Sequence, residues 1–188
     1  MNLIPSHDRI IIRPDDPLEI TSGGIYIPEL AQKRSVTGNV ISVGCECRCV
    51  RGGDRAAFQR YQGERWEELL IVREDQVLGV KDGEAFRPIM GQVLLRTLPQ
   101  SDRHGNLYIP TGGADRLDEP RWGVVVSQDP NEEWYSHKER RWIKKTIVLE
   151  PGSSVLYPTY SGTILDFGGQ EHVILLVSDV LGVIHKED

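Results

Sequence analysis

The chain has 188 residues, of which 28 are Asp or Glu and 22 are Lys or Arg, giving a formal net charge of −6. This acidic balance argues against a general nucleic-acid binder, whose surface needs excess Lys and Arg to neutralise phosphates. No apolar run approaches the roughly 18–20 residues that cross a bilayer, and the sequence starts without a charged or amphipathic leader. We therefore expect a cytoplasmic protein with no membrane partner and no nucleic-acid partner.

Short apolar runs separated by Pro, Gly and polar turns predict strands throughout the first half. The predicted strands cover residues 8–13, 37–44, 56–58, 69–72 and 77–80, with turns at 51–54, 61–63 and 73–76. No stretch shows convincing helical periodicity. Several short strands at this spacing predict an all-β fold, either a small barrel or a sandwich.

A long loop rich in Pro and Gly is predicted between the first two strands, over about residues 14–35. It contains residues 21–28, Thr-Ser-Gly-Gly-Ile-Tyr-Ile-Pro, which we call the first apolar segment. Paired glycines free the backbone, while the apolar triplet is surface that a monomer would normally bury. A loop of this length favours a binding role, and the alternative is a buried strand preceded by a tight turn. The candidate binding residues are Gly23, Gly24, Ile25, Tyr26 and Ile27.

The second half repeats the first in the same order. Residues 92–96 match the first strand, and residues 105–110, Gly-Asn-Leu-Tyr-Ile-Pro, match the first apolar segment. We call residues 105–110 the second apolar segment; its candidate binding residues are Leu107, Tyr108 and Ile109. Residues 121–126, 149–157 and 179–183 match the segments around residues 38–44, 50–58 and 76–80. Five matched blocks predict two tandem domains, residues 1–83 and 84–188, joined by a connection too short for independent movement.

These motifs together resemble the GroES (chaperonin-10) co-chaperonin family. The resemblance is carried by Pro5-Ser6-His7-Asp8-Arg9 before the first strand, the first apolar segment, the Gly38-Asn39-Val40-Ile41-Ser42-Val43-Gly44 strand and the Gly53-Asp54 turn. It implies two tandem GroES-like irregular β-barrels, with mobile loops at about residues 14–35 and 98–119. It also implies a ring-shaped homo-oligomer that caps a GroEL-type chaperonin and encloses unfolded substrate protein, with no enzyme activity and no cofactor. Ile25, Tyr26 and Ile27 would dock between two helices of the chaperonin's apical domain.

The second repeat departs from the family pattern. Met90-Gly91-Gln92 replaces the His-Asp-Arg signature, and Asn106 replaces one glycine, which makes docking by the second apolar segment less secure. Where the family has a roof hairpin, the first repeat has only residues 45–50 and the second has an insertion at about residues 131–146. We expect a substantial roof from the second domain alone, with an opening over the first.

Other residues have two interpretations each. By resemblance Tyr61 and Tyr160 face the cage interior, and the alternative is packing at the barrel ends. Cys45, Cys47 and Cys49 suggest zinc, but a structural site normally has four ligands, so thiols in a turn or partly buried are favoured and no metal is expected. Residues 138–145 interleave basic and aromatic side chains, as a nucleic-acid platform would or, as we favour, a solvated hairpin tip. His7 and Asp8 lack the nucleophile that a catalytic pair requires.

A two-barrel chain cannot fill seven ring positions evenly. Either seven chains each place one barrel in the docking ring, which we favour, or three or four chains place both. The rival function is a duplicated barrel, viral in origin for example, that binds something other than a chaperonin. The GroES-like domain of zinc dehydrogenases is a weaker alternative because the chain has no Gly-x-Gly-x-x-Gly motif.

Overall fold

The computed structural model describes residues 3–16, 35–59, 62–82, 85–98, 103–104, 107–108, 120–136, 139–144, 147–167 and 170–184. Strands supply most of the regular structure in these ranges, together with two short 3-10 helices, and the described residues form no α-helix. The predicted all-β class is confirmed. Within the described ranges no helix is long and apolar enough to span a membrane.

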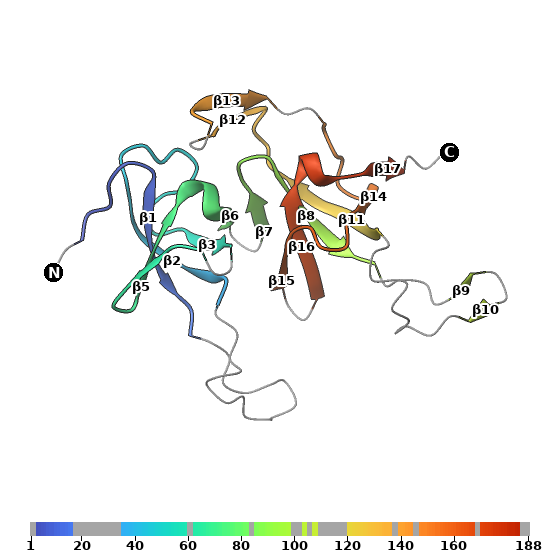
Figure 1. The fold of residues 1–188 in the computed structure, drawn as a ribbon, viewed down its shortest axis with the longest axis horizontal. Helices are drawn as coiled ribbons and strands as arrows, with labels where there is room; N and C mark the ends of the chain where they lie inside the picture. The colour runs from blue at the N-terminus through green and yellow to red at the C-terminus, as the bar shows by residue number, and fades with distance from the viewer. Residues whose placement is uncertain are drawn as a thin grey trace. The chain divides into compact units, whose positions relative to one another are not determined.

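The chain divides into two compact units, and unit 1 comprises Met1–Met90 and Tyr135–Trp142. Its main sheet is antiparallel and has the strand order β4-β5-β1-β2-β3-β6-β7 (Figure 1). The elements of this sheet are β1 (Arg9–Pro14), β2 (Thr37–Val43), β3 (Arg55–Phe58), β4 (Glu64–Trp66), β5 (Leu69–Arg73), the 3-10 helix η2 (Glu74–Gln76), β6 (Val77–Asp82) and β7 (Ala85–Pro88).

Unit 2 comprises Gly91–Trp134 and Ile143–Asp188, and its sheet has the order β15-β16-β8-β11-β14-β17. The elements are β8 (Gln92–Thr97), β11 (Arg121–Gln128), β14 (Ser154–Tyr157), β15 (Thr163–Phe167), β16 (Gln170–Leu176), the 3-10 helix η4 (Val177–Asp179) and β17 (Gly182–Ile184). Two further pairs of strands lie outside this sheet. They are β9 (Arg103–His104) with β10 (Leu107–Tyr108), and β12 (Glu133–Ser136) with β13 (Arg141–Lys144).

The two sheets are copies of one topology. Without its edge strand β7, the first sheet has the same strand order as the second: β4, β5, β1, β2, β3 and β6 correspond to β15, β16, β8, β11, β14 and β17. The copies share even an irregularity, because β2 and β11 each bulge by one residue, Ile41 and Val126, opposite the preceding strand of the repeat. The duplication therefore extends beyond the five sequence blocks to the detailed register.

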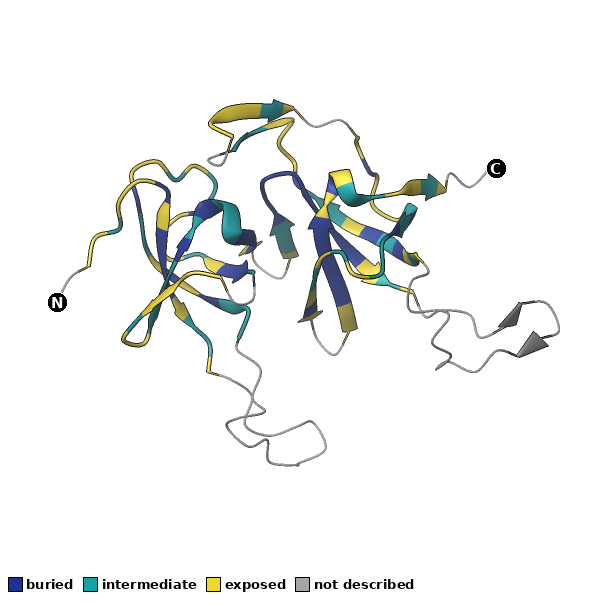
Figure 2. Cartoon of the chain, in the orientation of Figure 1, coloured by how far each residue is buried: buried dark blue, intermediate teal, exposed yellow. Residues whose placement is uncertain are grey.

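Buried residues on the central strands form the core of each unit (Figure 2). In unit 2 the buried cluster contains Val93, Leu95, Val125, Leu149, Val155, Tyr157, Val173, Leu175 and Val177. In unit 1 all three isoleucines of β1 are at most 1% exposed, so both faces of that strand are covered. Among the described strands, hydrogen bonding leaves both sheets open, with β4, β7, β15 and β17 at their edges.

Gly91, which immediately precedes β8, is expected to be sensitive to substitution. Its φ is +76°, and a Cβ there would lie 2.4 Å from the Trp134 ring. Gly91→Ala should lower the free energy of unfolding by about 2–4 kcal/mol, from backbone strain plus overpacking. Gly152→Ala is the matched control because its φ is +91° but no atom lies within 4 Å of the added Cβ; it should cost about 1–2 kcal/mol. Urea denaturation of both variants measures the difference, and equal losses would contradict the packing argument.

Candidate functional site

The first apolar segment, including Gly23, Gly24, Ile25, Tyr26 and Ile27, lies outside the described residues. Its two flanks are described, and they leave adjacent strands at one place. Pro14 pairs with Gly38, and the Asp15 N–H donates to the Thr37 carbonyl at 2.9 Å. The chain therefore departs from and returns to the sheet at neighbouring points on β1 and β2.

A polar side-chain cluster joins these flanks. The Asp15 carboxylate accepts a hydrogen bond from the Thr37 hydroxyl, and Arg55 Nη2 on β3 lies 2.6 Å from Asp15 Oδ2. We call Asp15, Thr37 and Arg55 the base cluster. It fixes both ends of the predicted binding loop to three strands. Sequence reasoning missed this cluster because its members are 22 and 40 residues apart and no local pattern joins them.

The second apolar segment has a different base. Its flanks keep the backbone hydrogen bond, now from the Leu98 N–H to the Trp122 carbonyl at 3.1 Å. Leu98 and Trp122 occupy the places of Asp15 and Thr37, and they are 38% and 39% exposed. The backbones of Leu107 and Tyr108 lie in β10, paired with β9, while Ile109 lies outside the described residues. The side-chain cluster of the first repeat is thus replaced by apolar surface in the second.

A buried acid organises the place where the family's roof would begin in the first repeat. The Glu74 side chain is fully buried, and its Oε1 accepts hydrogen bonds from the backbone N–H groups of Arg48, Cys49 and Val50 at 2.8, 2.7 and 3.3 Å. Buried N–H groups require acceptors, and here one carboxylate oxygen accepts hydrogen bonds from three backbone N–H groups. Sequence reasoning predicted only a polar turn at residues 73–76, with no sign that one of its acids is buried.

The second repeat places its acid elsewhere. Val177 occupies the position of Glu74, since both residues donate an N–H to the carbonyl before the first strand, Gly91 and Asp8 respectively. The acid of the second repeat is Asp129, which occupies the position of Gly44 and is fully buried. Its carboxylate accepts hydrogen bonds from the backbone N–H groups of Gly91 and Asn131 at 2.8 and 3.0 Å. Among the described residues, each repeat therefore has a fully buried carboxylate, Glu74 or Asp129, that accepts hydrogen bonds from backbone N–H groups of the segment following its second strand.

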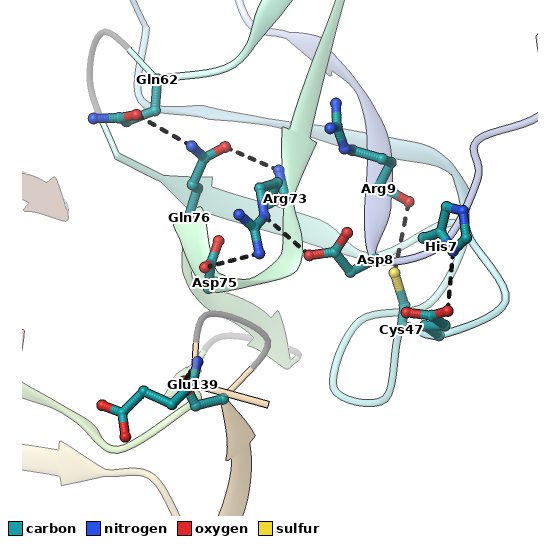
Figure 3. Close-up of polar contacts among 11 residues, drawn as sticks. His7, Asp8, Arg9, Cys47, Gln62, Arg73, Asp75, Gln76 and Glu139 are labelled. Atoms are coloured by element: carbon teal, nitrogen blue, oxygen red, sulfur yellow. Dashed lines mark hydrogen bonds and ion pairs between the residues drawn. The ribbon is translucent and has the colours of Figure 1, made fainter. Parts of the chain in front are cut away.

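His7 and Asp8 point to different partners (Figure 3). His7 Nδ1 lies 3.0 Å from Glu46 Oε1, whereas the Asp8 carboxylate accepts from Arg73 Nε at 3.0 Å. Arg73 also lies 3.6 Å from Asp75. These contacts connect the segment before β1 to the 45–50 loop and, through Arg73, to β5 and η2.

The three cysteines lie in the loop that Glu74 holds. Cys45 is exposed, and Cys47 donates its S–H to the Arg9 carbonyl at 3.6 Å. Burial, followed by the charge of Glu74, raises the pKa of Cys47 to about 12. A thiol with this pKa is protonated near neutral pH, whereas zinc binds the thiolate. Across the described ranges, no group of three or more His, Cys, Asp or Glu residues is placed to hold a metal ion.

The two predicted cage-facing tyrosines differ in what the structure describes. Tyr160 is 76% exposed, in the segment between β14 and β15, and Tyr61 lies outside the described residues. An exposed fraction of this size favours a surface position for the Tyr160 side chain over packing at the barrel end. Which surface it faces in an assembly stays a prediction.

Comparison with known proteins identifies the family. A family model described as the chaperonin 10 kDa subunit matches the chain twice, over residues 2–81 and 85–184. The chain belongs to this family. The fold of this family is a β-barrel. The predicted tandem arrangement of two GroES-like repeats is confirmed.

Relatives match the chain in two ways. The 20 kDa chloroplastic chaperonin of Spinacia oleracea is 27% identical over 96% of this chain and 74% of its own length. The co-chaperonin GroES of Thermodesulfovibrio yellowstonii is 34% identical over 43% of this chain and 97% of its own. That of Citrifermentans bemidjiense is 39% identical over the same shares. One GroES length thus corresponds to less than half of this co-chaperonin chain.

Proposed function

We propose that this protein caps a GroEL-type chaperonin ring and encloses substrate protein for ATP-dependent folding, without itself being an enzyme. The observation that carries the proposal is the chaperonin 10 kDa family match to both repeats. The base cluster supports it, because a docking loop needs a fixed root on a rigid sheet. The predicted cytoplasmic location stays a prediction, since the relatives include both bacterial and chloroplastic proteins.

The chemistry of the first apolar segment suits reversible docking. In an extended conformation Ile25 and Ile27 share one side and Tyr26 takes the other, so two isoleucines enter a groove together. Burying each isoleucine contributes roughly 1.5–3 kcal/mol, while ordering a segment costs about 2–5 kcal/mol. One segment therefore binds weakly. Several segments on one ring raise the avidity by about 10²–10⁴, and each contact still releases readily.

Assembly into a ring is part of the proposal, and the two units suggest how copies join. In unit 1, β6 pairs on one side with β3 and on the other with β7. β7 is the segment that immediately precedes β8, the first strand of the second repeat. In unit 2, β17 holds the place of β6 and pairs only with β14 among the described strands. Residues 3–5 precede β1 in the first repeat and therefore correspond to β7, which precedes β8 in the second. Leu3 and Ile4 are 37% and 83% exposed. We infer that residues 3–5 of one copy pair with β17 of the next.

Removing residues 2–5 is therefore expected to prevent assembly. Native mass spectrometry should give closed rings, of seven chains in the arrangement we favour, for the full chain and single chains for the truncated one. Rings of three or four chains would overturn the preferred stoichiometry. Rings that persist without residues 2–5 would overturn the proposed pairing.

Protease protection tests the proposed enclosure. A chemically denatured substrate is bound to a GroEL-type ring, this protein and ATP are added, and protease follows. The co-chaperonin proposal expects protection of the substrate only when protein and ATP are both present. Equal digestion with and without this protein would favour the rival, a duplicated barrel that retains the fold but binds something else.

A further inference from the structure

The hairpin of β12 and β13 belongs to the second repeat in sequence but not in spatial grouping. Its residues Tyr135–Trp142 cluster with unit 1, whereas the chain on both sides of them, Gly91–Trp134 and Ile143–Asp188, clusters as unit 2. The chain therefore leaves unit 2 at Trp134, contributes a hairpin to unit 1 and returns at Ile143.

Arg48, in the 45–50 loop of the first repeat, contacts this hairpin. Its guanidinium carbon lies 4.9 Å from the centroid of the Tyr135 ring and 5.1 Å from that of the Trp142 ring. The two rings pack edge to face, with centroids 5.7 Å apart and an interplanar angle of 72°. One ring comes from β12 and the other from β13, so a single cation contacts both strands of the hairpin.

The Arg48 side chain projects from a fixed backbone. Its N–H donates to the fully buried Glu74 carboxylate at 2.8 Å, and the next two N–H groups donate to the same oxygen. Because the loop is held in this way, little backbone freedom is lost when the guanidinium meets the rings.

Ion pairing does not account for the contact. Residues 133–144, which span the hairpin, contain four basic residues and two acids, Glu133 and Glu139. The Glu139 carboxylate lies 2.6 Å from Arg141 within the hairpin. A cation approaching this basic hairpin is repelled by its charges, so the attraction comes from the faces of the aromatic rings.

We propose that the 45–50 loop of the first repeat is the docking site for the 135–142 hairpin of the second, with Arg48 as its anchor. The first repeat has six residues where the second has an insertion at about 131–146. One hairpin then covers the loop region of the repeat that has no roof of its own, in place of the opening expected from the sequence.

Hydrogen–deuterium exchange on the full chain tests this proposal. Arg48→Ala should accelerate exchange of the backbone amides in residues 135–142 by about 5–30-fold, the loss expected for a cation shared by two rings. Arg48→Lys should restore part of the protection. Arg51→Ala, an exposed arginine three residues away, should match the wild type. Unchanged exchange in Arg48→Ala would overturn the proposal.

Two further measurements separate docking from general destabilisation. Trp142→Leu, which leaves Glu74 and its loop intact, should accelerate the same amides while those of β1 and β5 stay protected. Protection lost equally across β1, β5 and the hairpin would overturn a local docking site. Raising NaCl from about 0.05 to 0.5 M should preserve protection, since salt screens the repulsion between basic groups. Loss of protection at high salt would assign the contact to ion pairing and contradict the cation–π anchor.

Discussion

Replacing Ile25 and Ile27 together by aspartate is expected to weaken binding to a GroEL-type ring by at least about 10²-fold in the presence of ATP. Each isoleucine contributes roughly 1.5–3 kcal/mol when buried, and an aspartate in its place brings a charge that resists leaving water. The loss recurs in every chain of a ring, so avidity multiplies it. Titration of the chaperonin with labelled protein, followed by co-sedimentation, measures the apparent Kd.

Leu107→Asp/Ile109→Asp is the matched double substitution in the second repeat. The preferred two-tier arrangement expects it to leave the apparent Kd within about threefold of the wild type. A loss equal to that of the Ile25/Ile27 variant would show that both repeats dock. If the Ile25/Ile27 variant binds like the wild type, the assignment of the first apolar segment to docking is wrong.

Removing the Glu74 carboxylate is expected to cause a large loss of stability in unit 1. Glu74→Ala leaves the N–H groups of Arg48, Cys49 and Val50 without this acceptor. The Glu74 side chain is fully buried, so its removal also leaves space in the interior. We expect a decrease of about 3–5 kcal/mol in the free energy of unfolding. Urea denaturation followed by circular dichroism gives this value.

Asp75→Ala is the control for Glu74→Ala. Asp75 lies in the same 3-10 helix and pairs at 3.6 Å with Arg73, but its side chain is 29% exposed. Its removal should cost less than about 1 kcal/mol, as for a partly exposed ion pair. If Glu74→Ala costs no more than Asp75→Ala, the buried carboxylate is not what holds the 45–50 loop.

Most of the strands that sequence reasoning found have a clear burial pattern, although β16, with four consecutive buried residues, was not predicted. β1, with three buried isoleucines, and β8, with four consecutive buried residues, stand out because the core demands apolar side chains there. β4 was missed because two of its three residues are exposed and it lies at a sheet edge, so no burial pattern marks it. β7 was missed for a similar reason, since it contains proline and pairs on one side only.

The candidate site was only partly accessible to sequence reasoning. The apolar segments are local signals, because glycines and an apolar triplet are adjacent in the chain. The base cluster, the hydrogen bonds of Glu74 and Asp129, and the Arg48 contacts join residues that are far apart in the sequence. Strand pairing or the hairpin brings these residues together in the fold. The two repeats show why sequence reasoning missed these contacts. Glu74 and Gly44 of the first repeat correspond to Val177 and Asp129 of the second, so the acceptor for backbone N–H groups comes from a different strand end in each repeat.

The most direct test of the co-chaperonin function is size-exclusion co-elution of the wild-type protein with a GroEL-type ring, with and without ATP. We predict a complex that forms with ATP and is absent without nucleotide. Elution of the two proteins in separate peaks under both conditions would contradict the proposed function, whatever the fold and the family.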